Sequence, residues 1–464
     1  MEKIKANLKT KLFYAFGNMG SYVLWSFIGV YMTIYVTECL KPGDERIALL
    51  GTIVLVCRFF DAFSDIGMGL LVEKTHSKWG KGRFWFGLSI IPMLVVFFFI
   101  FFLSGLDKGA AIITISILYF LFTVVFYTMN GIGFNAMLPR ISNDSYDQSN
   151  ICTINSIFTS VGSLFTAITV TVLNHLGGEA SQQAWTIFVV MLIAIAFIGE
   201  ILCFIFVKEN PKIVISEAKA PDKKETWRGM KALFSCKYFY IAIAMFTLNY
   251  YLSLSVVGIG KYYAQYVLGN EDAFSLFGSV PMITMGIGLL LTPFAVKKLN
   301  KKNTLIIAIA CVVLGNLIGS VAPTSFAAAF TGVMVKGLGS AVVMSQLYTL
   351  APDMVDYIAK KTGIRVEGLA ASANSFGCKI GSGLGAATVL WLLPWCGYVA
   401  GADTQNNTAL MTFTTLYWWV PLGLSIILLI LASFWNIQKD TKKLEAVQAK
   451  KTEETAVSTP SGNL

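Results

Sequence analysis

Long apolar segments alternate with short polar ones along almost the whole chain of 464 residues. Each apolar segment has about the 20 residues that an α-helix needs to cross a bilayer. There are twelve of them, at residues 12–37, 47–72, 84–105, 110–138, 151–174, 184–207, 238–267, 273–295, 304–322, 326–351, 367–396 and 411–436. The pattern therefore predicts an all-α membrane protein with twelve transmembrane helices.

The longest internal polar segment, residues 208–237, separates six of these spans from the other six. We expect it to be a cytoplasmic linker between two six-helix halves, residues 1–207 and 238–438. The remaining residues, 439–464, are charged and then rich in Ser, Thr and Gly, which is typical of a disordered tail. A basic segment after the second span, residues 73–83, and another at 297–302 form a weak internal repeat between the halves.

Composition agrees with a membrane protein and charge gives its orientation. Hydrophobic residues make up 55% of the chain and charged residues only 13%, about half of what soluble domains carry. Of the 36 Lys and Arg residues, 29 fall in the termini and in the loops on the same side of the membrane. The excess of positive charge on cytoplasmic loops then predicts that both termini are cytoplasmic. It also accounts for the net charge of +10 without a nucleic-acid partner.

Cysteine and histidine give no sign of a metal centre or a disulfide framework. None of the eight Cys residues forms a C-x-x-C pair, and most lie in or beside apolar segments, where a free Cys acts as a small hydrophobic residue. The two histidines, His76 and His175, lie in predicted loops. We therefore expect no cofactor and no enzyme built on intramembrane histidines.

Three charged residues, Arg58, Asp61 and Asp65, lie inside the second span. Spacings of three and four residues put them on one helix face, and each charge costs about 2.5–3.5 kcal/mol in the bilayer centre. That face must look into the bundle. Two carboxylates one turn apart need a cation between them or a proton on one of them, so a cation site is predicted, with a structural ion network as the alternative. Oxygen ligands suit a hard cation, and the choice between Na⁺ and H⁺ stays open.

Two motifs, one in each half, carry a resemblance to a known family. The first is Asp61-x-x-x-Asp65 followed by Gly69, Lys74-Thr75, Lys78-Trp79-Gly80-Lys81 and Arg83; the second comprises Asp353, Asp356-Tyr357, Lys361-Thr362-Gly363, Arg365, Glu367-Gly368, Ser372 and Lys379. Together they resemble the glycoside–pentoside–hexuronide:cation symporters, to which bacterial melibiose carriers belong and which lie within the major facilitator superfamily. The resemblance covers all but the tail. It implies a facilitator fold in a bacterial inner membrane, a monomer, and a sugar or sugar acid imported with Na⁺ or H⁺.

The resemblance also implies roles for individual residues. Asp61 and Asp65 would bind the coupling cation with help from Thr128, and Ser64 stands where melibiose carriers have Asn. Lys379 would face the cavity, linked to the aspartates and to the sugar. Asn374 matches an amide position of the family.

Helices 1 and 4 carry the polar and aromatic residues that could hold a sugar, since aromatic rings stack on apolar sugar faces; ordinary helix packing is the alternative. The candidates are Asn18, Ser21, Tyr22, Trp25, Tyr127, Asn130 and Asn135, with Arg58 beside them. The acids that bind galactosides in melibiose carriers fall at Tyr22 and Gly131, and a helix-5 arginine falls at Asn155. A melibiose-like substrate is therefore not expected.

Lys336 lies about 15 Å along the tenth span, and no family motif explains it. A lysine at that depth is a functional candidate by default. It could pair with an acid such as Glu200, or it could bind the negative charge of an anionic sugar such as a uronate. With two acids missing from helices 1 and 4, the second interpretation predicts an anionic substrate.

Charged residues flank the predicted cytoplasmic loops of both halves. They are Lys74, Lys78 and Arg83 in the first half and Asp353, Asp356, Arg365 and Glu367 in the second. We predict that they form a cytoplasmic gate of inter-half salt bridges in one access state. Two alternatives to a sugar symporter stay open: a lysophospholipid-type facilitator, which also resembles the family, and a membrane-embedded enzyme.

Overall fold

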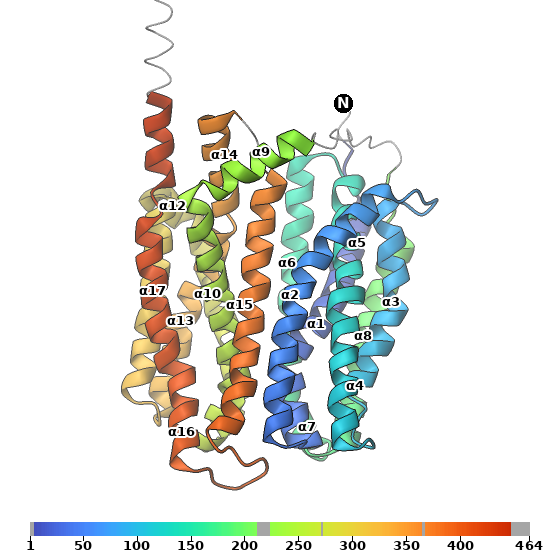
Figure 1. The fold of residues 1–464 in the computed structure, drawn as a ribbon, viewed down its shortest axis with the longest axis vertical. Helices are drawn as coiled ribbons and strands as arrows, with labels where there is room; N and C mark the ends of the chain where they lie inside the picture. The colour runs from blue at the N-terminus through green and yellow to red at the C-terminus, as the bar shows by residue number, and fades with distance from the viewer. Residues whose placement is uncertain (1–3, 211–222, 271, 364–366, 447–464) are drawn as a thin grey trace, which may run out of the picture.

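The computed structural model describes residues 4–210, 223–270, 272–363 and 367–446. Its described residues form helices joined by short loops, with no strand among them. Figure 1 shows the helices standing side by side as a bundle. We call the end of the bundle that carries the N-terminus and α9 the terminus side, and the opposite end the far side.

The first half contains α-helices and two π-helical turns. These are α1 (Leu8–Ile34), η1 (Tyr35–Leu40), α2 (Asp44–Lys74), α3 (Lys81–Ile100), α4 (Lys108–Phe120), η2 (Leu121–Tyr127), α5 (Thr128–Ile141), α6 (Ser145–Ala167), α7 (Thr169–His175) and α8 (Gln182–Phe206). Each predicted span corresponds to one of these helices or to a run of consecutive ones.

The second half is built in the same way. The linker contains α9 (Lys223–Phe234), and the second half comprises α10 (Lys237–Tyr262), η3 (Tyr263–Val267), α11 (Asp272–Ser279), α12 (Pro281–Val321), α13 (Phe326–Leu347), α14 (Leu350–Thr362), α15 (Glu367–Trp395), α16 (Asn407–Thr414), η4 (Thr415–Trp419) and α17 (Val420–Phe434). Residues 437–446 are also helical, so the first part of the predicted disordered tail is ordered. The rest of that tail lies outside the described residues.

Eleven helical runs of the described residues are long and apolar enough to cross a membrane. One of them, Asp272–Val321, has 50 residues, or about 75 Å of helix, which is more than twice the hydrocarbon thickness. It is broken at Asn300, whose φ of 69° and ψ of 159° are not helical. This run therefore crosses twice, which gives the predicted twelve spans, and a one-residue break replaces the loop expected at 297–302.

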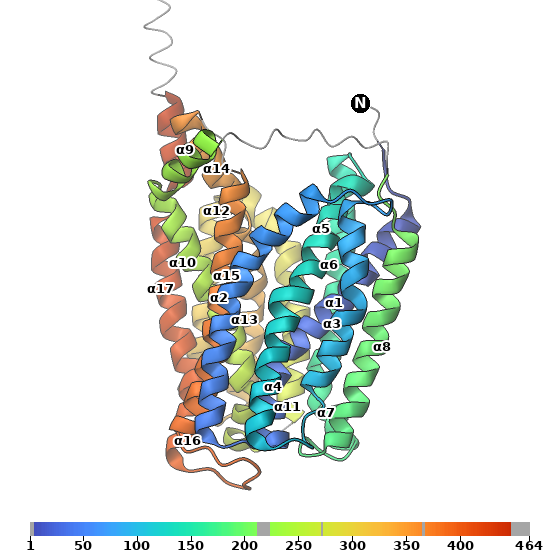
Figure 2. The ribbon, with the colours of Figure 1, turned by 45° about the vertical axis from the view of Figure 1, so that its right-hand side comes forward.

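The linker between the halves holds a helix that we did not predict. In Figures 1 and 2, α9 lies across the terminus side rather than along the bundle. Its Leu233 is buried against the apolar core of the second half, while Trp227 and Arg228 are exposed. An amphipathic helix in this position suits the surface of a membrane.

Glycines let several helices pack at backbone distance, most clearly along α15. A Cβ added at Gly381 would lie 2.2 Å from the carbonyl oxygen of Thr247 on α10, and one at Gly385 would lie 2.7 Å from that of Tyr251. Gly383 faces the other half, where a Cβ would meet the Arg58 side chain at 2.8 Å. The α2–α15 contact is the most extensive one between the halves, and Figure 2 shows the two helices side by side.

Candidate functional site

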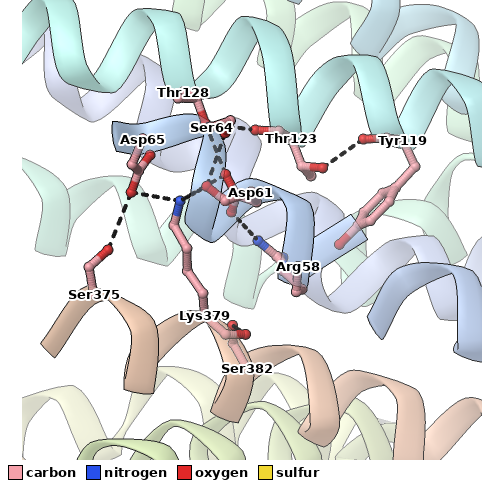
Figure 3. Close-up of polar contacts among 10 residues, drawn as sticks. All are labelled: Arg58, Asp61, Ser64, Asp65, Tyr119, Thr123, Thr128, Ser375, Lys379 and Ser382. Atoms are coloured by element: carbon pink, nitrogen blue, oxygen red, sulfur yellow. Dashed lines mark hydrogen bonds and ion pairs between the residues drawn. The ribbon is translucent and has the colours of Figure 1, made fainter. Parts of the chain in front are cut away.

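The centre of the candidate site is an ion cluster at the α2–α15 contact (Figure 3). Lys379 of α15 reaches across to α2, where its ammonium lies 2.9 Å from Asp61 Oδ1 and 2.7 Å from Asp65 Oδ2. The same ammonium donates to the backbone oxygen of Asp61 at 2.7 Å. An ammonium has three donors, so these three oxygens use all of them. Lys379 of the second half thus forms ion pairs with both predicted cation-binding carboxylates of the first half.

Hydroxyl groups complete the oxygen-rich surroundings of this cluster. Thr128 donates to Asp61 Oδ1 at 2.9 Å, and Ser64 lies 3.3 Å from the Thr128 oxygen. Thr128 follows directly after the π-helical turn η2, and such turns are frequent at functional sites. The structure therefore brings all four predicted cation-binding residues together. The described residues hold no group of three or more His, Cys, Asp and Glu side chains that could bind a metal ion. The oxygens available to a cation at the cluster are those of the two carboxylates, the hydroxyls of Ser64 and Thr128 and the carbonyl of Asp61.

Arg58 supplies the second positive charge of the site. Its guanidinium is buried, lies 3.8 Å from Asp61 Oδ2, and stacks over the Trp25 ring at 4.0 Å. Trp25 in turn stacks on Tyr127 with ring centroids 4.5 Å apart. A flat aromatic pair therefore lies directly beside the ion cluster. With Arg58 and Lys379 set against Asp61 and Asp65, the formal charges of the cluster sum to zero.

The other predicted substrate residues fall into two groups. Asn18 and Tyr22 are half-buried on α1, and Asn374 is buried on α15 with its carbonyl oxygen unpaired. At Gly131 a Cβ would meet nothing within 4 Å. Asn130, by contrast, turns away from the ion cluster and contacts Ser21, which also contacts Glu200.

Lys336 does not pair with Glu200. It lies on α13 in the second half, over the rings of Tyr417 and Trp418 at 5.4 and 5.3 Å, and its ammonium nitrogen has no hydrogen-bond partner. Its backbone packs on Gly315 of α12, whereas Glu200 is on α8 of the first half. The pairing prediction is wrong, because the ammonium of Lys336 lies over the rings of η4 in the second half, whereas the carboxyl group of Glu200 contacts Ser21 of the first half. The anionic-substrate prediction stays untested, and these contacts give it no support.

Among the described residues, the charges of the predicted cytoplasmic gate form no ion pair between the halves. Asp353 pairs with Lys301 of its own half at 2.7 Å, and Arg83 donates to the carbonyl of Phe204 at 2.8 Å, also within its own half. Lys74, Lys78 and Asp356 are exposed. Arg365 and the side chain of Glu367 lie outside the described residues. Inter-half pairing of these charges stays a prediction for another conformation.

On the far side, a network that we did not predict joins the two halves. Lys261 of α10 forms an ion pair with Glu179 of the α7–α8 loop and lies 4.0 Å from Glu38 of η1. Tyr398 donates to the same Glu38. Beside them, Thr37 and Tyr262 are hydrogen-bonded at 2.8 Å. The far side is therefore closed by buried polar contacts between the halves.

Sequence reasoning missed these residues for an identifiable reason. Lys261 and Glu38 each stand near the end of an apolar segment, where a long side chain reaches the interface without a partner. Ser375, which donates to Asp65 at 3.3 Å, was also missed. It lies four residues before Lys379, on the same face of α15, and that spacing was the available signal.

Comparisons with known proteins agree with this architecture. The family model described as MFS/sugar transport protein matches residues 13–439. The isoprimeverose transporter of Lactiplantibacillus pentosus is 25% identical over 96% of this chain and 92% of its own. The glucuronide carrier protein homolog of Escherichia coli (strain K12) is 22% identical over 92% of both chains. The inner membrane symporter YicJ of the same strain is 24% identical, over 89% of this chain and 88% of its own.

Solved structures show the same fold. A D-xylose-proton symporter superposes with a TM-score of 0.63 at 13% identity, covering 92% of this chain and 97% of that one. The nucleoside transporter NupG gives a TM-score of 0.61 at 17% identity, covering 91% and 98%. The matching family model and the curated relatives are transporters, so this chain is a transporter and not a membrane-embedded enzyme. With the family model matching most of its length, this chain belongs to the MFS/sugar transport protein family of membrane transporters.

Proposed function

We propose that this protein carries a sugar or sugar acid across the membrane together with Na⁺ or H⁺, and that Asp61 and Asp65 couple the two movements. One observation supports this above the others. The ammonium of Lys379, from the second half, is coordinated by three oxygens of α2 in the first half. A hard cation binds to oxygens of the same kind, so a coupling cation and Lys379 compete for them.

Electrostatic repulsion between a bound cation and Lys379 would couple cation binding to movement of the two halves. Because the four charges of the cluster sum to zero, an added cation gives the site an excess positive charge. Two unit charges 4 Å apart interact with about 4 kcal/mol at an effective dielectric constant of 20. Cation binding therefore weakens the hold of Lys379 on α2. Since Lys379 is on α15, release loosens the main contact between the halves and favours their movement.

The sugar would bind beside this cluster, on the Trp25–Tyr127 pair. Stacked aromatic rings present an apolar face, and Arg58, whose Nε and Nη1 atoms make no hydrogen bond, presents donors next to it. A sugar ring needs both an apolar surface and hydrogen-bond donors. Relatives named for isoprimeverose and for glucuronide transport fit a small glycoside or sugar acid.

We assign the structure to one access state of the transport cycle. In this state contacts join the halves on the far side, while the described charges of the predicted cytoplasmic gate do not pair between the halves on the terminus side. In it the far side is closed by the contacts of Lys261, Glu38 and Tyr398. If both termini are cytoplasmic, as the positive charge of the loops indicates, this state is the inward-facing one. The opposite state would break the far-side network and form the predicted cytoplasmic gate.

The test is transport by the purified protein in proteoliposomes. Radiolabelled neutral glycosides, pentosides and hexuronides are offered with an inward Na⁺ gradient, with an inward proton gradient, or with neither. We expect at least one sugar to accumulate only when one of the two gradients is present. Equal uptake with and without both gradients would contradict coupling, and no saturable uptake of any sugar would contradict the substrate class.

A further inference from the structure

A buried carboxyl group lies outside the ion cluster and has no role in the proposed coupling. Glu200 is on α8, six residues from its terminus-side end, and is 0% exposed. Its Oε1 atom lies 2.8 Å from the Ser21 hydroxyl, and its Oε2 atom has no hydrogen-bond partner. An ionised carboxylate in such a place is strongly unfavourable and becomes neutral instead.

The packing around Glu200 leaves little room for water. A Cβ added at Gly199 would lie 2.7 Å from the carbonyl oxygen of Phe16 on α1, and one at Gly20 would lie 2.9 Å from that of Ala196. A Cβ at Gly17 would collide with Cys203 one turn further along α8. The α1 and α8 backbones are thus in direct contact on both sides of Glu200.

No positive charge compensates Glu200 among the described residues. The charged and titratable side chains on the elements around it are Lys9, Lys11, Tyr14, Tyr22 and Tyr31 on α1, Lys81 and Arg83 on α3, Tyr127 on η2, Arg140 on α5, His175 on α7 and Cys203 on α8. None of these forms a hydrogen bond or an ion pair with Glu200. The cationic side chains on the helices that pack against α8 have other partners. Arg83 of α3 donates to the carbonyl of Phe204, and Lys11 of α1 pairs with Asp147.

With Asn130 Oδ1 facing Ser21, as in this structure, the number of available hydrogens fits a protonated carboxyl group. The single hydroxyl hydrogen of Ser21 faces two acceptors, Asn130 Oδ1 at 2.9 Å and Glu200 Oε1 at 2.8 Å, and it can serve only one. If Glu200 carries a proton, its O–H donates to Ser21 and Ser21 donates to Asn130. Both contacts of the Ser21 hydroxyl are then hydrogen bonds.

We propose that Glu200 is a proton-binding site. The hydrogen bonds that connect Glu200 to Ser21 and Ser21 to Asn130 change direction when the proton binds or leaves. When the proton leaves, it passes to water and no other group is ionised. The Asn130 amide then turns over, so that its Nδ2 atom donates to Ser21 and Ser21 donates to the carboxylate. Each state of the carboxyl group thus has its own set of hydrogen bonds.

The site is placed to influence the ion cluster. Asn130 is two residues after Thr128, which donates to Asp61. The hydrogen bonds of Glu200, Ser21 and Asn130 and the ion cluster therefore both involve the first turn of α5. A movement of α1 away from α8 would admit water and release the proton. This inference rests on the packing of α1, α5 and α8, and it holds whether or not Asp61 and Asp65 bind a cation.

Infrared difference spectroscopy tests the proposal without substrate or Na⁺. The purified full-length protein is reconstituted in nanodiscs, and spectra near neutral pH are compared for the wild type, Glu200→Gln and the control Glu209→Gln. Glu209 is the matched control because its carboxylate accepts backbone N–H groups of α3 at 2.8 to 3.1 Å. We expect Glu200→Gln to lose one protonated-carboxyl C=O band and Glu209→Gln to keep it. An unchanged set of protonated-carboxyl bands in Glu200→Gln would overturn the proposal.

A second variant keeps the test decisive if Glu200→Gln does not fold. Ser21→Ala removes the acceptor for the Glu200 proton but leaves the carboxyl group in place. We expect the same band to move to higher frequency, because a carboxylic acid without a hydrogen-bond acceptor has a stiffer C=O bond. A spectrum of Ser21→Ala identical with that of the wild type would overturn the proposal.

Discussion

Replacing Lys261 with Met should open the far side of this transporter. The Lys261 side chain is 2% exposed and lies between the carboxylates of Glu179 and Glu38, whose side chains are 11% and 8% exposed. The variant leaves two buried negative charges without a cation. In the opposite access state, where the halves separate on this side, water can solvate both carboxylates.

The size of the effect follows from this burial. Removing one partner of a buried ion pair costs about 3–5 kcal/mol, and the slight exposure of Glu179 and Glu38 argues for the lower end. A cost of about 3 kcal/mol changes an equilibrium ratio about 100-fold, since each 1.4 kcal/mol is a factor of ten. We therefore expect Lys261→Met to shift the equilibrium about 100-fold away from the closed far side.

Hydrogen–deuterium exchange measures this shift in the purified protein. In Lys261→Met, exchange should increase in peptides covering residues 35–41 and 260–268 and decrease in peptides from the terminus side. Lys108→Met is the matched control, since Lys108 is exposed on the same side. Faster exchange at both ends would indicate general destabilisation, and exchange equal to that of the wild type at residues 35–41 would refute the reasoning.

Three further predictions follow from single contacts. Lys336→Met should raise the melting temperature and leave sugar uptake unchanged, because it removes a buried ammonium without a hydrogen-bond partner; loss of uptake in a folded variant would make Lys336 a substrate residue after all. Gly381→Ala should destabilise the protein by about 1–3 kcal/mol, because its Cβ would collide with Thr247, whereas Gly423→Ala meets nothing within 4 Å and should leave the melting temperature unchanged; equal melting temperatures would contradict this. A cysteine at Asn406 should react with an impermeant reagent added outside intact cells and one at Trp227 should not; the reverse would overturn the proposed orientation.

The sequence was sufficient for the spans because membrane crossing depends on length and hydropathy alone. Asp61, Asp65 and Lys379 were predicted as a group for two reasons. The charges inside the second span require that face of the helix to look into the bundle, and the family resemblance indicated Lys379 as their partner. The ordered helix at residues 223–234 was missed because its polar composition resembles that of a flexible linker.

Which helices face one another was harder to predict. Spans that are apolar on every side have no periodic polar face, so the sequence does not show which neighbour a lone polar residue meets. Lys336 and Glu200 were suggested as a pair on charge alone, but the structure places Lys336 against η4 and Glu200 against α1. Lys261 is on α10 and Glu38 is on η1, and only the packing of the two halves brings them together.

The central claim is that Asp61 and Asp65 couple sugar movement to a cation, and vesicle transport of Asp61→Asn and Asp65→Asn tests it most directly. The sugar found by the uptake panel is followed in two modes in the same proteoliposomes: accumulation driven by the cation gradient, and exchange at equal sugar concentration on both sides. If the two carboxylates couple the movements, both variants lose accumulation while exchange persists. Accumulation of the sugar against its gradient by both variants would contradict this claim.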